Sequence, residues 1–149
     1  MSLLSWLGNG DEKNVSPAVS SEFADEQLSG LNLQQVLNAH TAWKTRLQLV
    51  LDGTSDEEFE IEEVSQDCNC FLGKWIYSEG KKQFGHLPEF EAARGAHADF
   101  HVSAGEVLFQ HQIGNVEQAE RLLKTKFRTA SNKNQMELTR LFMVAKTKQ

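Results

Sequence analysis

Two histidines, His97 and His101, stand four residues apart in the segment AHADFH. On a helix this spacing directs both imidazoles from one face, so the pair offers two neutral nitrogen donors to a transition metal. A zinc protease with two such histidines needs a glutamate directly after the first one as its general base, but Ala98 occupies that position. The pair therefore indicates metal binding without hydrolysis.

A third histidine, His40, falls on the apolar stripe of another amphipathic segment, residues 31–51. Taken alone, His40 would be interpreted as a core histidine that bonds to a carbonyl. Three histidines on buried stripes, however, need a partner that replaces their hydrogen bonds to water. A metal ion satisfies all three, and one thiolate completes a closed tetrahedral site with no place for a catalytic water. Closed coordination is typical of a structural or sensing site.

Two cysteines, Cys68 and Cys70, are the candidates for the thiolate. In a regular helix, residues two apart point away from each other, so both do not easily bind one ion. The apolar stripe of residues 71–76, extended backwards, falls on Cys68 rather than Cys70. Periodicity alone therefore places Cys68 in the core and leaves the choice of ligand open.

Helical periodicity predicts the elements that must position these residues. The predicted helices are residues 31–51, 64–78, 88–112 and 116–145. Gly53, Gly80 and Gly114 lie where the pattern stops, Thr54 to Glu63 is expected to be an acidic solvated loop or a ragged helix start, and residues 81–87 a connector. No run alternates with period two for long enough to predict a strand. Short connections between amphipathic helices predict an all-α fold, an antiparallel four-helix bundle with a short cysteine-bearing helix.

The length of 149 residues suits one domain with tails. Residues 1–28 combine Gly, Ser and scattered charge and are predicted to be a flexible tail, which leaves residues 29–146 as the domain. The apolar group within residues 3–7 is interpreted as a frayed terminus, or as a contact with a partner or a membrane surface.

Charge and composition exclude several classes of function. A net charge of -6 without a basic stripe argues against a nucleic-acid partner. Two cysteines this close together do not form the disulfide framework of a secreted protein, and residues 1–7 lack the positive region of a signal peptide. No segment approaches the apolar length of a transmembrane span. We therefore expect a cytoplasmic protein with reduced thiols.

The segment CFLGKW, residues 70–75, resembles the chemoreceptor zinc-binding (CZB) domain of bacteria when taken with His40 before it and His97 and His101 after it. The order of histidine, cysteine and two histidines is similar to the ligand pattern of that family. The resemblance covers residues 31–141, and the C-x-L-G-x-W box with both flanking elements is more specific than a lone H-x-x-x-H.

The resemblance implies a four-helix bundle, often a homodimer, that holds one Zn²⁺ per subunit through His40, Cys70, His97 and His101. It favours Cys70 as the ligand and leaves Cys68 as a buried small hydrophobe or a resolving thiol. In that family the domain is a cytosolic sensor attached to chemoreceptors or cyclic-di-GMP synthases, and it responds to zinc or, in some members, to hypochlorous acid. Because no signalling or catalytic domain follows, we expect a stand-alone member.

Other polar residues lie near the four ligands in the sequence or elsewhere in the domain without a ligand role. Asp67 and Asp99 are near the ligands in sequence and could accept imidazole N–H groups, but solvated surface carboxylates are an equal interpretation. His86 and His111 fit no four-ligand scheme, and we expect His111 to be partly exposed near a helix end.

We therefore predict a zinc-binding regulatory domain that acts through conformational change and protein contacts and is not an enzyme. One alternative is a metal-dependent oxidoreductase with iron in a helical bundle, but such sites recruit carboxylates, and no E-x-x-H occurs on the proposed helices. The other alternative is a dimerising adaptor whose zinc is only structural.

Overall fold

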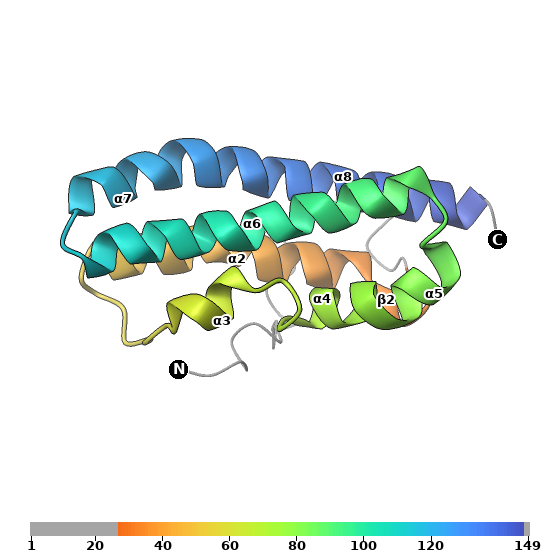
Figure 1. Cartoon of the computed structure of the whole chain (residues 1–149), viewed down its shortest axis with the longest axis horizontal. Coiled ribbons are helices and arrows are strands. Elements are labelled where there is room, and N and C mark those ends of the chain that lie inside the picture. Colours follow the sequence, from red (N-terminus) through yellow and green to blue (C-terminus); the bar gives the residue numbers. More distant parts are fainter. Residues whose placement is uncertain (1–26, 148–149) are drawn as a thin grey trace.

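The computed structural model describes residues 27–147 of the chain, and this part is mostly helical (Figure 1). The prediction of a helical protein is thereby confirmed. Most of the predicted N-terminal tail, including the apolar group at residues 3–7, lies outside the described residues. No helix within residues 27–147 combines the length and the apolar character that crossing a membrane requires.

The described residues form two short strands and a series of α-helices, which are β1 (Gln27–Leu28), β2 (Leu31–Asn32), α2 (Leu33–Leu51), α3 (Ile61–Ser65), α4 (Phe71–Trp75), α5 (Lys81–Phe84), α6 (Pro88–Gln112), α7 (Val116–Leu122) and α8 (Arg128–Thr147). Single π-helical turns connect some of them: η3 (Ile76–Gly80) joins α4 to α5, and η4 (Leu123–Phe127) joins α7 to α8. Helical backbone therefore continues through residues 71–84 and again through residues 116–147.

Helices α2 and α6 begin and end close to the predicted positions because their termini carry strong local signals. The Asn32 side chain caps α2 by accepting a hydrogen bond from the backbone N–H of Gln35. Pro88 stands in the first turn of α6, where its missing N–H has no helical partner to lose. Gly53 and Gly114 follow the two helices with φ of 77° and 87°, a conformation that favours glycine.

The short antiparallel pairing of β1 with β2 was not predicted. Leu28 lies opposite Leu31, and a tight turn through Ser29 and Gly30, both at positive φ, joins the strands. Two residues per strand are too few for an alternating pattern to be visible. Both leucines are buried, so the pair closes one end of the core.

The cysteine-bearing region is not the continuous helix predicted over residues 64–78. Helix α3 ends at Ser65, residues 66–70 are not helical, and α4 begins at Phe71 with Cys70 as its N-cap. A Cβ atom on Gly73 would lie 1.6 Å from the carbonyl oxygen of Asp67, so the 66–70 loop folds directly onto the first turn of α4. A tertiary contact that helical periodicity does not encode thus interrupts the predicted helix.

The expected stop at Gly80 was also wrong, and the predicted connector over residues 81–87 is confirmed only for residues 85–87. Helical backbone passes through Gly80 and continues as α5 to Phe84. A Cβ atom on Gly80 would lie 2.6 Å from the Trp75 ring. The glycine in the π turn therefore leaves space for the indole ring of Trp75. Glycine here serves packing rather than helix termination.

Helix α6 packs against α2, α3, α7 and α8 and provides the centre of the core. It lies beside the α7–α8 segment, which runs in the opposite direction after the turn at Gly114 (Figure 1). Trp43, Phe100, Phe127 and Phe142 are among the largest fully buried side chains. The inward faces of α2 and α6 therefore meet in an apolar, closely packed interior.

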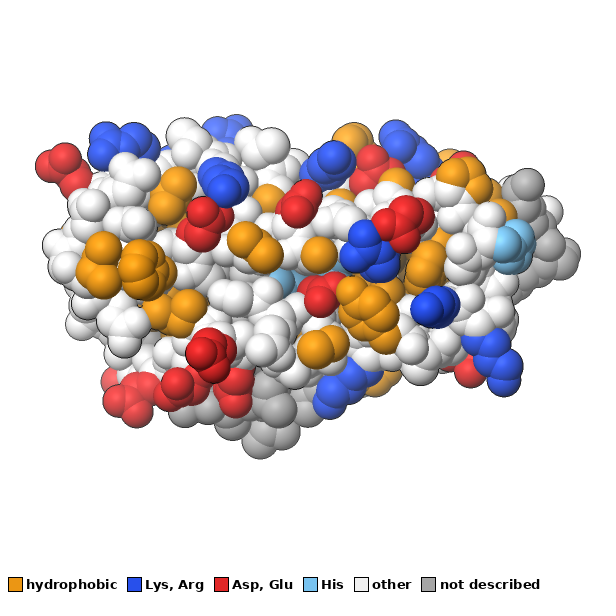
Figure 2. Space-filling model, viewed as in Figure 1, with side chains coloured by type: hydrophobic (Ala, Val, Ile, Leu, Met, Phe, Trp, Pro, Cys, Tyr) orange, Lys and Arg blue, Asp and Glu red, His pale blue; other side chains and the backbone are white. Residues whose placement is uncertain are grey.

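The acidic stretch before α3 is exposed, as expected of a solvated loop. Residues 54–60 are not helical, and their acidic side chains point to solvent. Figure 2 shows these red side chains gathered over the loop and α3 at the lower edge, while lysines and arginines lie along the upper edge over α7 and α8 and also in the right half of the view. The acidic loop is thus a solvated surface feature.

Candidate metal centre

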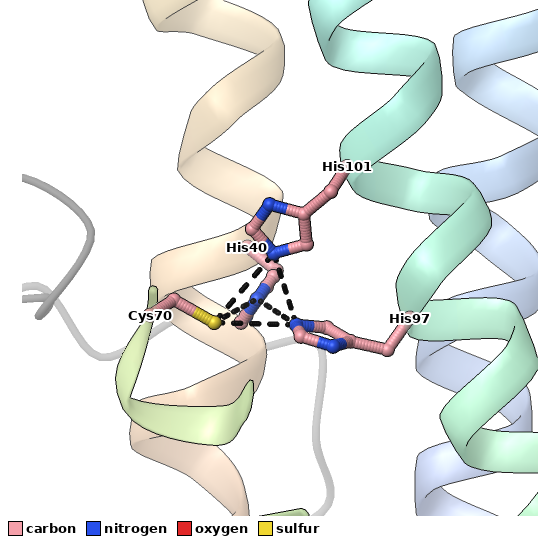
Figure 3. A group of neighbouring side chains, drawn as sticks. All are labelled: His40, Cys70, His97 and His101. Atoms are coloured by element: carbon pink, nitrogen blue, oxygen red, sulfur yellow. Dashed lines mark hydrogen bonds between the residues drawn. The ribbon is translucent and has the colours of Figure 1, made fainter. Parts of the chain in front are cut away.

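The four side chains predicted to bind a metal converge in the core (Figure 3). His40 comes from α2, Cys70 from the N-cap of α4, and His97 and His101 from one face of α6. Each supplies one donor atom, and these atoms all lie within 4.8 Å of one another. His40 is 2% exposed and the other three are 0% exposed. Three helices therefore contribute to one enclosed polar group.

Five of the six distances between the donor atoms are close to the edges of a tetrahedron around a small ion. The Nε2 atom of His97 lies 3.2 Å from Nε2 of His40 and 3.0 Å from Nε2 of His101. The Cys70 Sγ atom lies 3.2, 3.6 and 3.7 Å from the Nε2 atoms of His97, His101 and His40. Tetrahedral zinc separates two nitrogen ligands by about 3.3 Å and nitrogen from sulfur by about 3.6 Å. These five separations are thus close to those between zinc ligands, and all four donors lie within 4.8 Å of one another.

In each ring, the nitrogen that points away from the group is Nδ1. Its hydrogen bond determines whether the Nε2 atom, which faces the centre, carries a proton or a lone pair. His40 Nδ1 donates to the carbonyl of Val36 at 2.8 Å, and His101 Nδ1 donates to the carbonyl of Val64 at 2.8 Å. Because a carbonyl only accepts, each Nδ1 holds the proton and each Nε2 presents a lone pair. His97 Nε2 can donate to only one of these two nitrogens. The Cys70 thiol, at 3.7 Å from His40 Nε2 and 3.6 Å from His101 Nε2, is the other possible donor. A metal ion would bind a lone pair from all four side chains at once, so the residues present fit a metal.

Backbone carbonyls, rather than the carboxylates of Asp67 and Asp99, hold the outer nitrogens of His40 and His101. Asp67 instead accepts a hydrogen bond from the Tyr77 hydroxyl at 2.6 Å, and Asp99 is exposed. The suggestion that these carboxylates orient the imidazoles was therefore wrong for both rings. His97 Nδ1 is buried and has no hydrogen-bond partner among the described residues.

Burial keeps the group uncharged in the absence of a metal. It lowers the pKa of His40 to about 4 and that of His101 to about 3, and it lowers the pKa of His97 well below 6.5. Neighbouring imidazoles lower the pKa of His97 and His101 further. Burial also raises the pKa of the Cys70 thiol to about 12. Near neutral pH the group therefore consists of three neutral imidazoles and a thiol, and a metal ion would displace the thiol proton.

The position of Cys70 as a helix N-cap explains why this cysteine, and not Cys68, faces the histidines. The Cys70 Sγ atom accepts a hydrogen bond from the backbone N–H of Gly73 at 3.3 Å, which favours the thiolate. Cys68 is exposed, and its thiol lies near the side chains of Gln66 and Asn69. The expectation of a buried Cys68 was wrong because residues 66–70 do not continue the helix whose periodicity suggested it.

The remaining histidines lie outside the group, as expected. His86 is exposed, and His111 is half-buried near the end of α6. An aromatic side chain, Phe100, seals the site on its inner side, with its ring 5.1 Å from His40, 5.5 Å from His101 and 5.2 Å from Phe127. The site is therefore enclosed by apolar packing as well as by its own ligands.

Sequence reasoning missed the two carbonyl partners. Val36 precedes His40 by four residues, a spacing at which a helical histidine can reach back to a carbonyl, so the sequence held a usable signal. Val64 is far from His101 in sequence and reaches it only because α3 packs against α6. No local pattern could have indicated that second contact.

The helical fold and the buried group of three histidines and one cysteine define a domain with a candidate metal centre. Residues 40–108 match the family model of the chemoreceptor zinc-binding domain. This segment is therefore similar to that domain, and it includes all four residues of the group. Comparison with curated proteins and with solved structures gave no match.

Proposed function

We propose that this protein is a zinc-binding sensor domain that holds one Zn²⁺ through His40, Cys70, His97 and His101. The observation that carries the proposal is the convergence of three histidine nitrogens and one sulfur within 4.8 Å in a fully buried place. Carbonyl bonds to the outer nitrogens of two of these rings support the same role, since metal-binding histidines commonly donate their second N–H in this way.

The donor set favours zinc over iron. Three imidazoles and a thiolate suit tetrahedral zinc, whereas iron sites in helical bundles usually include carboxylates. The group that the described residues form contains no carboxylate. We therefore propose a binding and signalling role rather than an enzymatic one, with no oxygen chemistry at the centre.

Cys70 is the point at which a signal would enter. When bound, zinc would hold Cys70 as a thiolate, the form that hypochlorous acid and related oxidants attack. Cys70 also begins α4 and ends the loop that follows α3, so its release from the group would free both neighbours. This connection supports a conformational response to zinc or oxidant that partner proteins could detect.

The match of residues 40–108 to the family model supports the wider setting of the proposal. We propose an antiparallel four-helix bundle that forms a homodimer in the cytoplasm. Its signalling partner would be of the chemoreceptor or diguanylate cyclase type, in chemotaxis or cyclic-di-GMP signalling. These assignments extend what is common in the family to this chain.

The first experiment is metal analysis and zinc titration of the purified protein and two cysteine variants. We expect one zinc per chain, a large loss of affinity in Cys70→Ala because a ligand is removed, and little change in Cys68→Ala because that thiol is exposed. Equal affinity in Cys70→Ala and the wild type, or a visible absorption spectrum typical of iron, would overturn the proposal.

A sensor and a purely structural zinc site differ in their response to oxidant. Hydrogen exchange over residues 66–84, measured before and after treatment with hypochlorous acid, should increase in the wild type and not in Cys70→Ser. Exchange that stays unchanged in the oxidised wild type would favour the structural adaptor.

A further inference from the structure

Helix α3 reaches the candidate metal centre through one backbone atom. The carbonyl oxygen of Val64 accepts the Nδ1–H of His101 at 2.8 Å, which fixes the orientation of that ring and the proton position. The Val64 side chain is 2% exposed and packs into the main core. Helix α3 thus positions a candidate ligand without supplying one.

The placement of α3 depends on tertiary contacts because the helix is weak by itself. It spans five residues, and no side chain caps its N-terminus. A helix of this length has little stability of its own in water. The position of the Val64 carbonyl is therefore set by how closely α3 can approach α6.

Gly105 is the residue of α6 that permits this close approach. It follows His101 by four residues and so lies on the same face, one turn further along. A Cβ atom on Gly105 would lie 1.9 Å from Oγ and 3.1 Å from Cβ of Ser65, the last residue of α3. At Gly95 on the same helix a Cβ atom would meet nothing within 4 Å. The packing of α3 against α6 thus requires a residue without a side chain at Gly105 and has no such requirement at Gly95.

Displacement of α3 would also reach the cysteine. The side-chain amide of Asn69 donates to the carbonyl of Glu63 at 3.1 Å and ties the 66–70 loop to α3. Cys70 follows Asn69 directly. A shift of α3 therefore affects His101 through Val64 and Cys70 through the loop.

We propose that Gly105 is a positioning residue for the metal centre. By admitting Ser65, it holds α3 at the distance at which the Val64 carbonyl orients His101. The inference rests on the proposed zinc function, and it assigns a role to a residue that touches no ligand atom. Loss of an outer hydrogen bond to a metal-binding histidine typically weakens metal affinity about 10- to 100-fold.

The test is the zinc affinity of Gly105→Ala, measured by competition with a chromogenic chelator. We expect about 10- to 100-fold weaker binding than in the wild type, because the added methyl group lies 3.1 Å from Ser65 Cβ even when the Ser65 hydroxyl turns away, so that α3 must shift. Gly95→Ala is the matched control on the same helix and should bind zinc as the wild type does. Its thermal stability should rise slightly, since alanine favours a helix over glycine.

A second substitution distinguishes positioning from general damage. In the pair S65G/G105A the glycine moves to α3, which removes both close contacts and leaves only the Ser65 Cα position, 3.5 Å from the added methyl group. We expect zinc affinity to return close to that of the wild type. Should Gly105→Ala not fold, Ser65→Val tests the same contact from the α3 side and should weaken zinc binding in the same way.

The visible spectrum after Co²⁺ substitution reports the geometry of the ligands, which thermal stability does not measure. Tetrahedral Co²⁺ absorbs strongly, so a misaligned His101 should reduce the band intensity in Gly105→Ala and not in S65G/G105A. Equal zinc affinity in Gly105→Ala and the wild type would overturn the inference, as would a double variant as weak as the single one. Failure of the wild type itself to bind zinc would instead overturn the proposed function.

Discussion

Acid should destabilise the metal-free protein through its buried histidines. Burial lowers the pKa of His40 from 6.5 to about 4, so between these pH values the unfolded chain binds a proton at this residue that the folded chain does not. Stability then decreases as pH falls, with a slope of about 1.4 kcal/mol per pH unit for each proton. Between pH 6.5 and pH 5 the loss from His40 alone is about 1.6 kcal/mol, because the unfolded histidine is only half protonated at pH 6.5.

His97 and His101 act in the same direction. Their pKa values are also lowered by burial, that of His101 to about 3, so all three histidines release protons on folding in this range. Between pH 6.5 and pH 5, His40 and His101 together lose about 3 kcal/mol, and His97 adds to this loss, which is a large share of the stability of many domains. The metal-free protein should therefore lose much of its stability on mild acidification.

The assay is urea denaturation of chelator-treated protein at pH values from 7.5 to 5, followed by circular dichroism. His40→Leu removes one titrating group and should reduce the slope by about 1.4 kcal/mol per pH unit. His86→Gln changes an exposed histidine outside the group and should leave the slope unchanged. A free energy of unfolding that stays constant from pH 6.5 to pH 5 would refute the argument from burial.

Two further predictions concern the thiol and the aromatic seal. Burial raises the pKa of Cys70 from 9 to about 12, so the folded metal-free protein keeps a proton that the unfolded chain loses. Its stability should therefore fall as pH rises above 9, and Cys70→Ala should remove this decrease in urea titrations. Phe100→Ala should leave a cavity beside His40 and Phe127 and cost about 3 to 5 kcal/mol of stability in thermal or urea unfolding. An unchanged melting temperature in that variant would contradict the packing described here.

Local signals explain which parts of the fold could be predicted. The ends of α2 and α6 carry Asn32, Pro88 and glycines at positive φ, whose effects act within one helical turn. Residues 66–70 carry no such local signal. Their path depends on a contact with α4, in which the Asp67 carbonyl approaches Gly73. The predicted helix over residues 64–78 failed for that reason.

By itself, the sequence determined that His97 and His101 share a helical face and that His40 lies on a second apolar stripe, because helix geometry depends only on residue spacing. Only the tertiary structure decided that residues 66–70 leave the helix, so that Cys70 enters the core and Cys68 faces solvent. It also decided that the Val64 carbonyl orients His101. Both outcomes depend on contacts between segments distant along the chain, and local periodicity carries no information about such contacts.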